Sequence, residues 1–235
     1  SFRCGYRFLT EICIMNIVLV AATPYEIQPT GEFLAERAYH RKNCSVQRII
    51  TGVGMLNTAY GLTKKFAANK PDLAIQAGIA GTMHPFYPPG MVTVVKEEIL
   101  GDWGVEENGF FRDVFDLDLA EKDIFPFSKK MLINPHHQIL HKIHLQQVRA
   151  VTVNEITTSS RRVHELIEKY GPVLESMEGA AFHYVCLQED IPFVQLRAVS
   201  NFIGERDKSK WLIKEAIENL NRELIILINN MFNKE

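Results

Sequence analysis

Two glutamates and one asparagine stand where short apolar runs give way to polar sequence. Glu26 lies in AATPYEI, Glu178 lies in LESMEGAAF, and Asn201 lies in RAVSNFIG. Taken singly, each has a simple interpretation: an exposed loop acid, a first-turn helix acid facing the helix dipole, and a turn former. Together they predict an active site, because open α/β sheets bind ligands at the carboxyl ends of their strands. A carboxylate there can activate water or grip a polar ligand, and an amide can both donate and accept hydrogen bonds.

The elements that must position these side chains follow from the apolar pattern. Strands are expected at 16–22, 46–52, 72–81, 90–100, 148–153 and 192–200. Helices are expected at 57–69, 159–171, 178–190 and 208–232. This alternation predicts an α/β fold: a single domain with a central mixed, largely parallel sheet flanked by helices.

Bulk composition narrows the class of protein. The 235 residues are 46% hydrophobic and 23% charged, with a formal net charge of −2. That balance gives no electrostatic reason to expect nucleic acid or a membrane as partner, and no apolar run reaches the length of a membrane span. The four cysteines are scattered without a Cys-x-x-Cys pair, which argues against a zinc knuckle or a disulfide framework and favours the cytoplasm.

The first residues have two interpretations. Arginines followed by an apolar run superficially resemble a secretory signal. Alternatively, Met15 is the natural start, residues 1–14 are a non-native extension, and NIVLVAA is a buried first strand. We favour the second interpretation, which makes 15–235 one domain. Its long irregular segment is 101–128, and loops of that length are usually functional or mobile.

Three other motifs give weaker evidence about the function. GVGMLN (52–57) lacks the third glycine of a dinucleotide-binding fingerprint. AGIAG (77–81) is predicted to be a strand running into a glycine turn, where backbone can approach a ligand closely. His137, His141 and His144 have helical spacing that a metal could use, but no carboxylate or cysteine matches it, so no metal site is expected.

Three longer segments, in order, resemble the purine nucleoside phosphorylase and nucleosidase superfamily. They are MNIVLVAATPYEI, GVGMLNTAYGLTKKFAANKPDLAIQAGIAG and LESMEGAAFHYVCLQEDIPFVQLRAVSN, and the resemblance runs from Met15 to the C-terminus. It implies a nucleoside substrate, no metal or organic cofactor, and a homodimer or higher homo-oligomer. It also implies roles for several residues: Glu178 and Met177 at the ribose, Ile156 and Asn201 at the base, and Gly78, Ala80 and Gly81 in the glycine turn.

The ending RAVSNFIGERDKSKW and the DWGVEENGFF loop resemble the futalosine hydrolases of this superfamily. Those enzymes release hypoxanthine from futalosine in an alternative menaquinone pathway. Adenine-specific nucleosidases have an aspartate where this chain has Asn201. A carboxylate suits the amine donor of adenine, whereas hypoxanthine presents an O6 acceptor that needs the N–H of an amide. Asn201 therefore indicates a 6-oxopurine.

Hydrolysis is favoured over phosphorolysis. Phosphorylases of the superfamily place an arginine on phosphate just after the first strand, whereas AATPYEIQPT has no arginine and offers Glu26 as a base for water. Arg206 is a candidate for the distal carboxylate of the substrate, or else a member of a surface ion pair. Three alternatives stay open: a methylthioadenosine/S-adenosylhomocysteine nucleosidase, a catalytically silent nucleoside-binding protein, and a phosphorylase.

Overall fold

The computed structural model describes residues 15–37 and 44–232. The extension predicted at 1–14 lies outside the described residues. The main sheet contains β1 (Met15–Ala21), β2 (Cys44–Ile50), β3 (Leu73–Thr82), β4 (Val92–Leu100), β7 (Leu132–Ile133), β8 (Gln147–Thr152), β9 (Leu174–Ser176) and β10 (Phe193–Phe202). The helices are α1 (Pro24–Arg37), α2 (Met55–Ala68), α3 (His137–Leu140), α4 (Ser160–Tyr170), α5 (Gly179–Gln188) and α6 (Ile213–Phe232).

The sheet is mixed and largely parallel. Strand β1 pairs in parallel with β2 and β3, and β3 pairs in parallel with β10. Strand β10 then pairs with β4, β4 with β8, β8 with β9, and β9 again with β3, so these pairings close into a ring. The predicted single α/β domain with flanking helices is confirmed.

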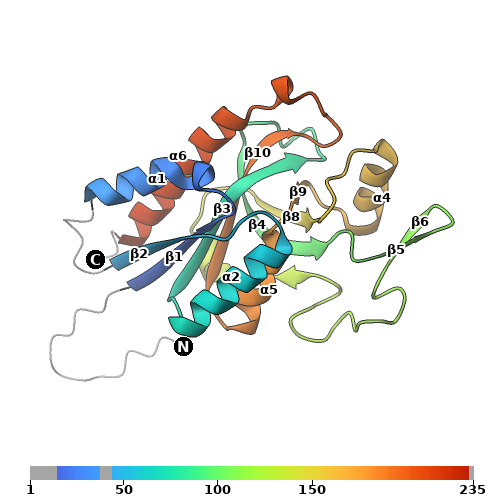
Figure 1. Cartoon of the computed structure of the whole chain (residues 1–235), viewed down its shortest axis with the longest axis horizontal. Coiled ribbons are helices and arrows are strands. Elements are labelled where there is room, and N and C mark those ends of the chain that lie inside the picture. The colour runs from blue at the N-terminus through green and yellow to red at the C-terminus, as the bar shows by residue number, and fades with distance from the viewer. Residues whose placement is uncertain (1–14, 38–43, 233–235) are drawn as a thin grey trace.

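Helices cover the two faces of the sheet in pairs, α1 with α6 and α2 with α5 (Figure 1). Alternate residues of β1 pack against the two helix layers, because successive strand side chains point to opposite faces of the sheet. Ile17 and Leu19 belong to the apolar cluster that includes α6, whereas Val18 and Val20 pack with α2 and α5. Burial on both faces explains why NIVLVAA is a continuous apolar run.

The predicted helix at 159–171 has the ends that its sequence indicates. The side chain of Ser159 accepts a hydrogen bond from the backbone N–H of Arg162, 3.1 Å away, and Gly171 ends the helix in the left-handed conformation at φ 63°. The predicted start of the last helix at 208 is wrong. Residues Lys208–Lys210 form a separate 3₁₀ turn, and α6 begins at Ile213.

The sequence pattern missed helix α1 and strand β9. Helix α1 begins with Pro24 at its first position, which suits proline, but Pro29 and Gly31 further along weaken its helical pattern. The predicted glycine turn at 77–81 is also wrong, since β3 continues through it to Thr82. Gly78 and Gly81 are strand residues at which the absence of a side chain makes room for neighbours.

The segment 101–128 is more regular than expected. It contains the hairpin β5 (Gly104–Glu107) and β6 (Phe110–Asp113), whose turn is Asn108-Gly109 with φ of 52° and 80°. Two residues with positive φ make the hairpin turn that Asn-Gly favours. The prediction of an irregular segment is wrong here, because this turn signal was not recognised.

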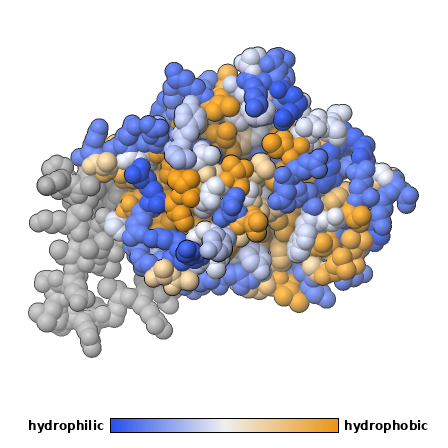
Figure 2. Space-filling model, viewed as in Figure 1, coloured by the Kyte–Doolittle hydropathy of each residue, from blue (hydrophilic) through white to orange (hydrophobic). Residues whose placement is uncertain are grey.

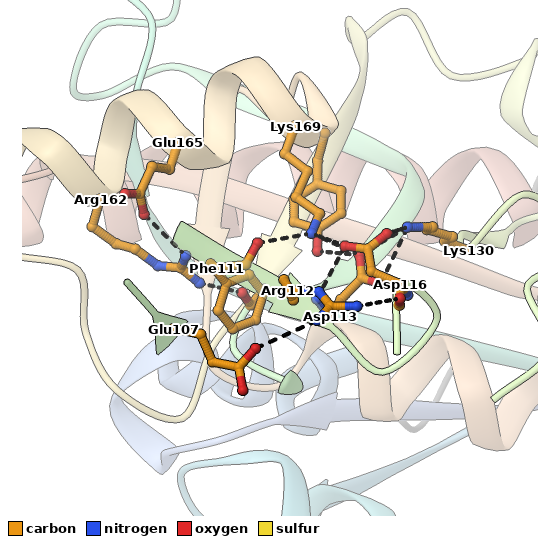
Figure 3. A network of polar contacts seen from close by, with 11 residues as sticks. Glu107, Phe111, Arg112, Asp113, Asp116, Lys130, Arg162, Glu165 and Lys169 are labelled. Atoms are coloured by element: carbon orange, nitrogen blue, oxygen red, sulfur yellow. Dashed lines mark hydrogen bonds and ion pairs between the residues drawn. The ribbon is translucent and has the colours of Figure 1, made fainter. Parts of the chain in front are cut away.

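A polar network ties this segment to helix α4 (Figure 3). The carboxylate of Asp113, 2% exposed, accepts hydrogen bonds from the Tyr170 hydroxyl at 2.7 Å and from the Lys130 ammonium at 3.1 Å. Lys169 contacts the same carboxylate at 3.3 Å and also pairs with Asp116. Burial alone would raise the pKa of Asp113, but these donors lower it overall, so the network stays ionised.

Candidate active site

A cavity of about 270 Å³ opens where the carboxyl ends of β1, β3, β9 and β10 converge. This position agrees with the rule for ligand sites in α/β sheets. The cavity brings together most of the residues predicted from the sequence. Those that line it are Glu26, Ile156, Met177, Glu178, Ala80, Gly81 and Asn201.

Glu26 lies in the first turn of α1 and is 7% exposed, so its interpretation as an exposed loop acid is wrong. Its Oε2 accepts hydrogen bonds from the backbone N–H of Thr23 at 2.9 Å and from the Thr23 hydroxyl at 3.2 Å. Its Oε1 accepts from the backbone N–H of Ile79 at 3.2 Å. These donors fix the carboxylate at the edge of the cavity, in a geometry suited to orienting a water molecule.

Glu178 is the N-cap residue of α5 and is 6% exposed. Its Oε1 accepts a hydrogen bond from the backbone N–H of Gly54 at 3.0 Å, and its Oε2 lies 3.5 Å from Nη1 of Arg197. Gly54 has φ 94°, a conformation that favours glycine. The GVGMLN turn therefore holds this acid in place.

Arg197 is a residue next to the cavity that the sequence analysis missed. It lies within β10, is 1% exposed, and donates from Nη2 to Oε1 of Gln76 at 3.0 Å. A Cβ atom at Gly78 would lie 2.4 Å from Arg197 Nη1 and 2.9 Å from Glu26 Oε1. Gly78 is thus needed so that the guanidinium and the carboxylate can both approach the backbone. An arginine inside the apolar strand PFVQLRAVS was the available signal, since buried charges are rare unless paired.

Asn201 lies near the end of β10 and is 8% exposed. The pairing of β10 with β3 shifts register between Val199 and Asn201, an irregularity that can redirect a side chain. Oδ1 of Asn201 accepts from the Ser200 hydroxyl at 2.7 Å, and Nδ2 donates to the carbonyl of Phe202 at 2.9 Å. These two hydrogen bonds orient the amide at the cavity.

Two predicted residues do not line the cavity. Gly78 contacts the side chains of Arg197 and Glu26 instead. Arg206 is exposed, and its guanidinium lies 5.9 Å from the ring of Trp211, which does line the cavity. Arg206 is thus one side chain away from the site.

A buried network supports the turn that carries Glu178. Oε2 of Glu98 accepts from the Thr152 hydroxyl at 2.8 Å, and Thr152 Oγ1 accepts from the backbone N–H of Ala180 at 2.8 Å. Oε1 of Glu98 accepts from Gln195 at 2.8 Å. This chain of hydrogen bonds fixes the first turn of α5, and with it the position of Glu178.

Gly179, in the sequence MEGAA, lies where no side chain fits, and this gives a first prediction. A Cβ atom at Gly179 would lie 1.8 Å from Glu98 Oε1 and 2.5 Å from Gln195 Nε2. Gly179→Ala should therefore lower the free energy of unfolding by about 3 kcal/mol, measured by denaturant titration. Gly61→Ala is the matched control, because its nearest neighbour would be Thr51 at 3.4 Å. If the two variants were equally stable, steric crowding at Gly179 would be refuted.

The pH dependence of stability should report on Glu98. Burial raises the pKa of Glu98 to about 7, against opposing hydrogen bonds from Gln195 and Thr152 and the charge of Arg197. Because the folded pKa exceeds the unfolded one, this residue contributes stability below the unfolded pKa, and the contribution is lost as pH rises through the folded pKa. Between about pH 4 and about pH 8, wild type should lose about 3 kcal/mol relative to Glu98→Gln. A constant difference in unfolding free energy would contradict this expectation.

Metal ligands do not converge in the described part of the chain, where no group of three His, Cys, Asp or Glu side chains could hold an ion. The helical spacing of His137, His141 and His144 does not correspond to one helix, because α3 ends at Leu140. His144 instead contacts Glu223, with 3.0 Å between Nε2 and Oε2. Within the described residues, no helix has the length and apolar character needed to span a membrane.

The fold and the site define a class of protein. A family model described as the Phosphorylase superfamily matches residues 16–231, so the chain belongs to the phosphorylase superfamily. Futalosine hydrolase from Thermus thermophilus is 31% identical over 175 residues, which are 73% of this chain and 76% of the relative. A 5'-methylthioadenosine/S-adenosylhomocysteine nucleosidase from Maridesulfovibrio salexigens is 23% identical, over 87% of this chain and 93% of the relative. The native structure of futalosine hydrolase from Helicobacter pylori superposes with a TM-score of 0.75 at 14% identity, covering 92% of this chain and 98% of that one.

Proposed function

We propose that this protein hydrolyses the N-glycosidic bond of futalosine and releases hypoxanthine and dehypoxanthine futalosine. The observation that carries the proposal is the oriented amide of Asn201 in the cavity that also holds Glu26 and Glu178. The 31% identity to a protein named futalosine hydrolase supports it. In this function the chain acts in the futalosine pathway of menaquinone biosynthesis, and we place it in the cytoplasm.

The amide selects the base. The second N–H of Asn201 Nδ2 can donate to O6 of hypoxanthine, because the first N–H is engaged by the Phe202 carbonyl. An adenine amine in the same place would meet a donor and leave both groups unpaired. Such a mismatch in a buried site lowers kcat/KM by orders of magnitude.

Glu26 is the base on the attacking water. Three protein donors hold its carboxylate, from Thr23 and Ile79, and it remains next to open cavity. Water bound there can lose a proton to Glu26 as its oxygen attacks the anomeric carbon. Phosphate would be repelled by this carboxylate, and the stretch 21–30 has no arginine to offset that repulsion.

Glu178 holds the ribose hydroxyls, with Met177 beneath the sugar. Cleavage passes through an oxocarbenium-like sugar, and a fixed anion next to the ring stabilises its positive charge. Arg197 positions Glu178 through its contact with Oε2 and also lies against Gly78, next to Glu26. Ile156, 44% exposed at the mouth of the cavity, stacks on the base.

We further propose a homodimer or higher homo-oligomer. Large apolar side chains are exposed around the start of α2 and in the 101–128 segment, and Figure 2 shows apolar surface near the centre of the view and at its lower right. The most exposed side chains in these two regions are Leu56, Tyr60, Phe110, Leu119 and Phe125. Burying such surface against a second copy would be favourable.

Arg206 remains the candidate for the distal carboxylate of futalosine, next to Trp211.

The function is tested by incubating the protein with futalosine, inosine and methylthioadenosine in phosphate-free buffer and identifying the released base. We expect hypoxanthine from futalosine. Adenine from methylthioadenosine as the main product would instead establish the nucleosidase activity named for the relative at 23% identity. A rate that depends on added phosphate would establish a phosphorylase, and no release of base would establish a binding protein.

A further inference from the structure

We propose that Glu175 is the general acid that protonates the departing purine, an inference that rests on the proposed function. Breaking the glycosidic bond leaves negative charge on the base, and an acid that donates a proton there lowers the barrier. The amide of Asn201 cannot serve as that acid, because it does not ionise near neutral pH. The site must therefore draw the proton from another residue or from water.

Glu175 has a carboxyl oxygen that lacks a partner. It lies in β9, is 5% exposed, and lines the cavity. Its Oε1 accepts a hydrogen bond from the backbone N–H of Thr157 at 3.0 Å. Its Oε2 is buried and has no hydrogen-bond partner among the described residues. An unpaired buried oxygen of this kind is costly unless a ligand completes it, which points to a contact made only with substrate.

The sheet places Glu175 in one row with Asn201. Gly81 of β3 pairs with Glu175 on one side and with Asn201 on the other. Directly paired residues present their side chains to the same face, and two strand spacings separate the outer backbones by about 10 Å. Gly81 has no side chain, and Ile203 packs against it as an apolar wall. A flat base held by Asn201 would therefore lie within reach of Glu175.

The other acids of the cavity already have hydrogen-bond partners on both carboxylate oxygens. Glu26 accepts three hydrogen bonds, and Glu178 accepts one from Gly54 and contacts Arg197. Burial raises the pKa of Glu175, against hydrogen bonds from Thr157, and the charge of Asp102 raises it further while that of Arg162 lowers it. Glu175 therefore retains a proton closer to neutral pH than an exposed glutamate does.

Cleavage transfers one proton from Glu175 to the base and one from water to Glu26. The bond between C1′ and N9 breaks, and its electron pair passes into the purine. The proton on Oε2 of Glu175 moves to N7, which gives neutral hypoxanthine and a Glu175 carboxylate. Water adds its oxygen to C1′ and gives one proton to Glu26. Glu26 then releases its proton to solvent, and Glu175 takes up a proton from solvent.

The experiment uses a leaving group that needs no proton. A purine nucleoside methylated at N7 already carries positive charge on the base, so its cleavage does not require an acid. Glu175→Gln should lower kcat on the nucleoside that wild type cleaves best by about 10²-fold, and should leave kcat on its N7-methyl derivative little changed. Glutamine keeps an acceptor for the Thr157 N–H. Glu155→Gln, which removes an exposed carboxylate nearby, is the matched control and should leave both rates unchanged.

The possible results separate the two proposals. If Glu175→Gln lowered kcat equally on both nucleosides, Glu175 would have a binding or structural role. If both rates were unchanged, Glu175 would have no role in the reaction. Either result would overturn the proposal that Glu175 is the general acid. Wild type that cleaves another purine nucleoside but not futalosine would refute the proposed substrate alone. Wild type that cleaves no nucleoside would overturn both proposals.

Discussion

Glu26→Gln should lower kcat on futalosine by about 10³-fold, while the affinity for hypoxanthine stays close to that of wild type. The carboxylate lies at the cavity with three donors from Thr23 and Ile79 fixing its orientation. Glutamine preserves the size of the side chain and one acceptor oxygen, but it cannot take a proton from water. The base and ribose contacts are made by other side chains, so binding should survive. Single-turnover kinetics and equilibrium binding of hypoxanthine measure the two effects separately.

A variant on the same helix controls for local disturbance. Glu32 is exposed in α1 and accepts a hydrogen bond from Gln28 at 2.9 Å. Glu32→Gln removes one negative charge from the same helix without touching the cavity, and it should keep wild-type turnover. Normal turnover in Glu26→Gln would remove this residue from the mechanism. A fall in hypoxanthine affinity as large as the fall in kcat would show that the substitution had disrupted the pocket.

The sequence could predict the strands and the positions at which they end, because burial on both faces produces continuous apolar runs such as NIVLVAA. Glu26, Glu178 and Asn201 were identified by that reasoning, since side chains at the carboxyl ends of neighbouring strands share one edge of the sheet. Helix α1 was missed because Pro29 and Gly31 weaken its local pattern. Its stability comes from tertiary contacts, including the packing against α6.

Other parts of the site depend on contacts between distant segments, which spacing along the chain does not encode. Gly78 and Gly179 look like ordinary turn or helix glycines in the sequence. In the structure, the space at Gly78 is taken by Arg197 and that at Gly179 by Glu98. Arg197 lies inside the apolar run PFVQLRAVS, which indicates burial but does not identify its partners Glu178 and Gln76. Glu175 lies in β9, a strand that the apolar pattern did not predict, so its burial could not be foreseen.

Asn201→Asp should shift the preference between a 6-oxopurine and a 6-aminopurine nucleoside by about 10³-fold in kcat/KM, toward the 6-amino compound. Aspartate removes the N–H that faces O6 and supplies an acceptor for the adenine amine. It also places a carboxylate against the carbonyl of Phe202, to which Nδ2 now donates at 2.9 Å. Some loss of absolute activity is therefore expected, and the ratio of the two kcat/KM values is the quantity to measure.

Asn201→Ala distinguishes selection by hydrogen bonding from selection by shape. Alanine removes the donor and the acceptor together, so activity should fall on both nucleosides and the preference should shrink without inverting. An inverted preference only in Asn201→Asp would tie specificity to the direction of one hydrogen bond. If the ratio stayed the same in both variants, Asn201 would not read the base. Discrimination between the two bases would then have to come from other residues at this edge of the sheet, such as Glu175, which pairs with Gly81 on the side opposite Asn201.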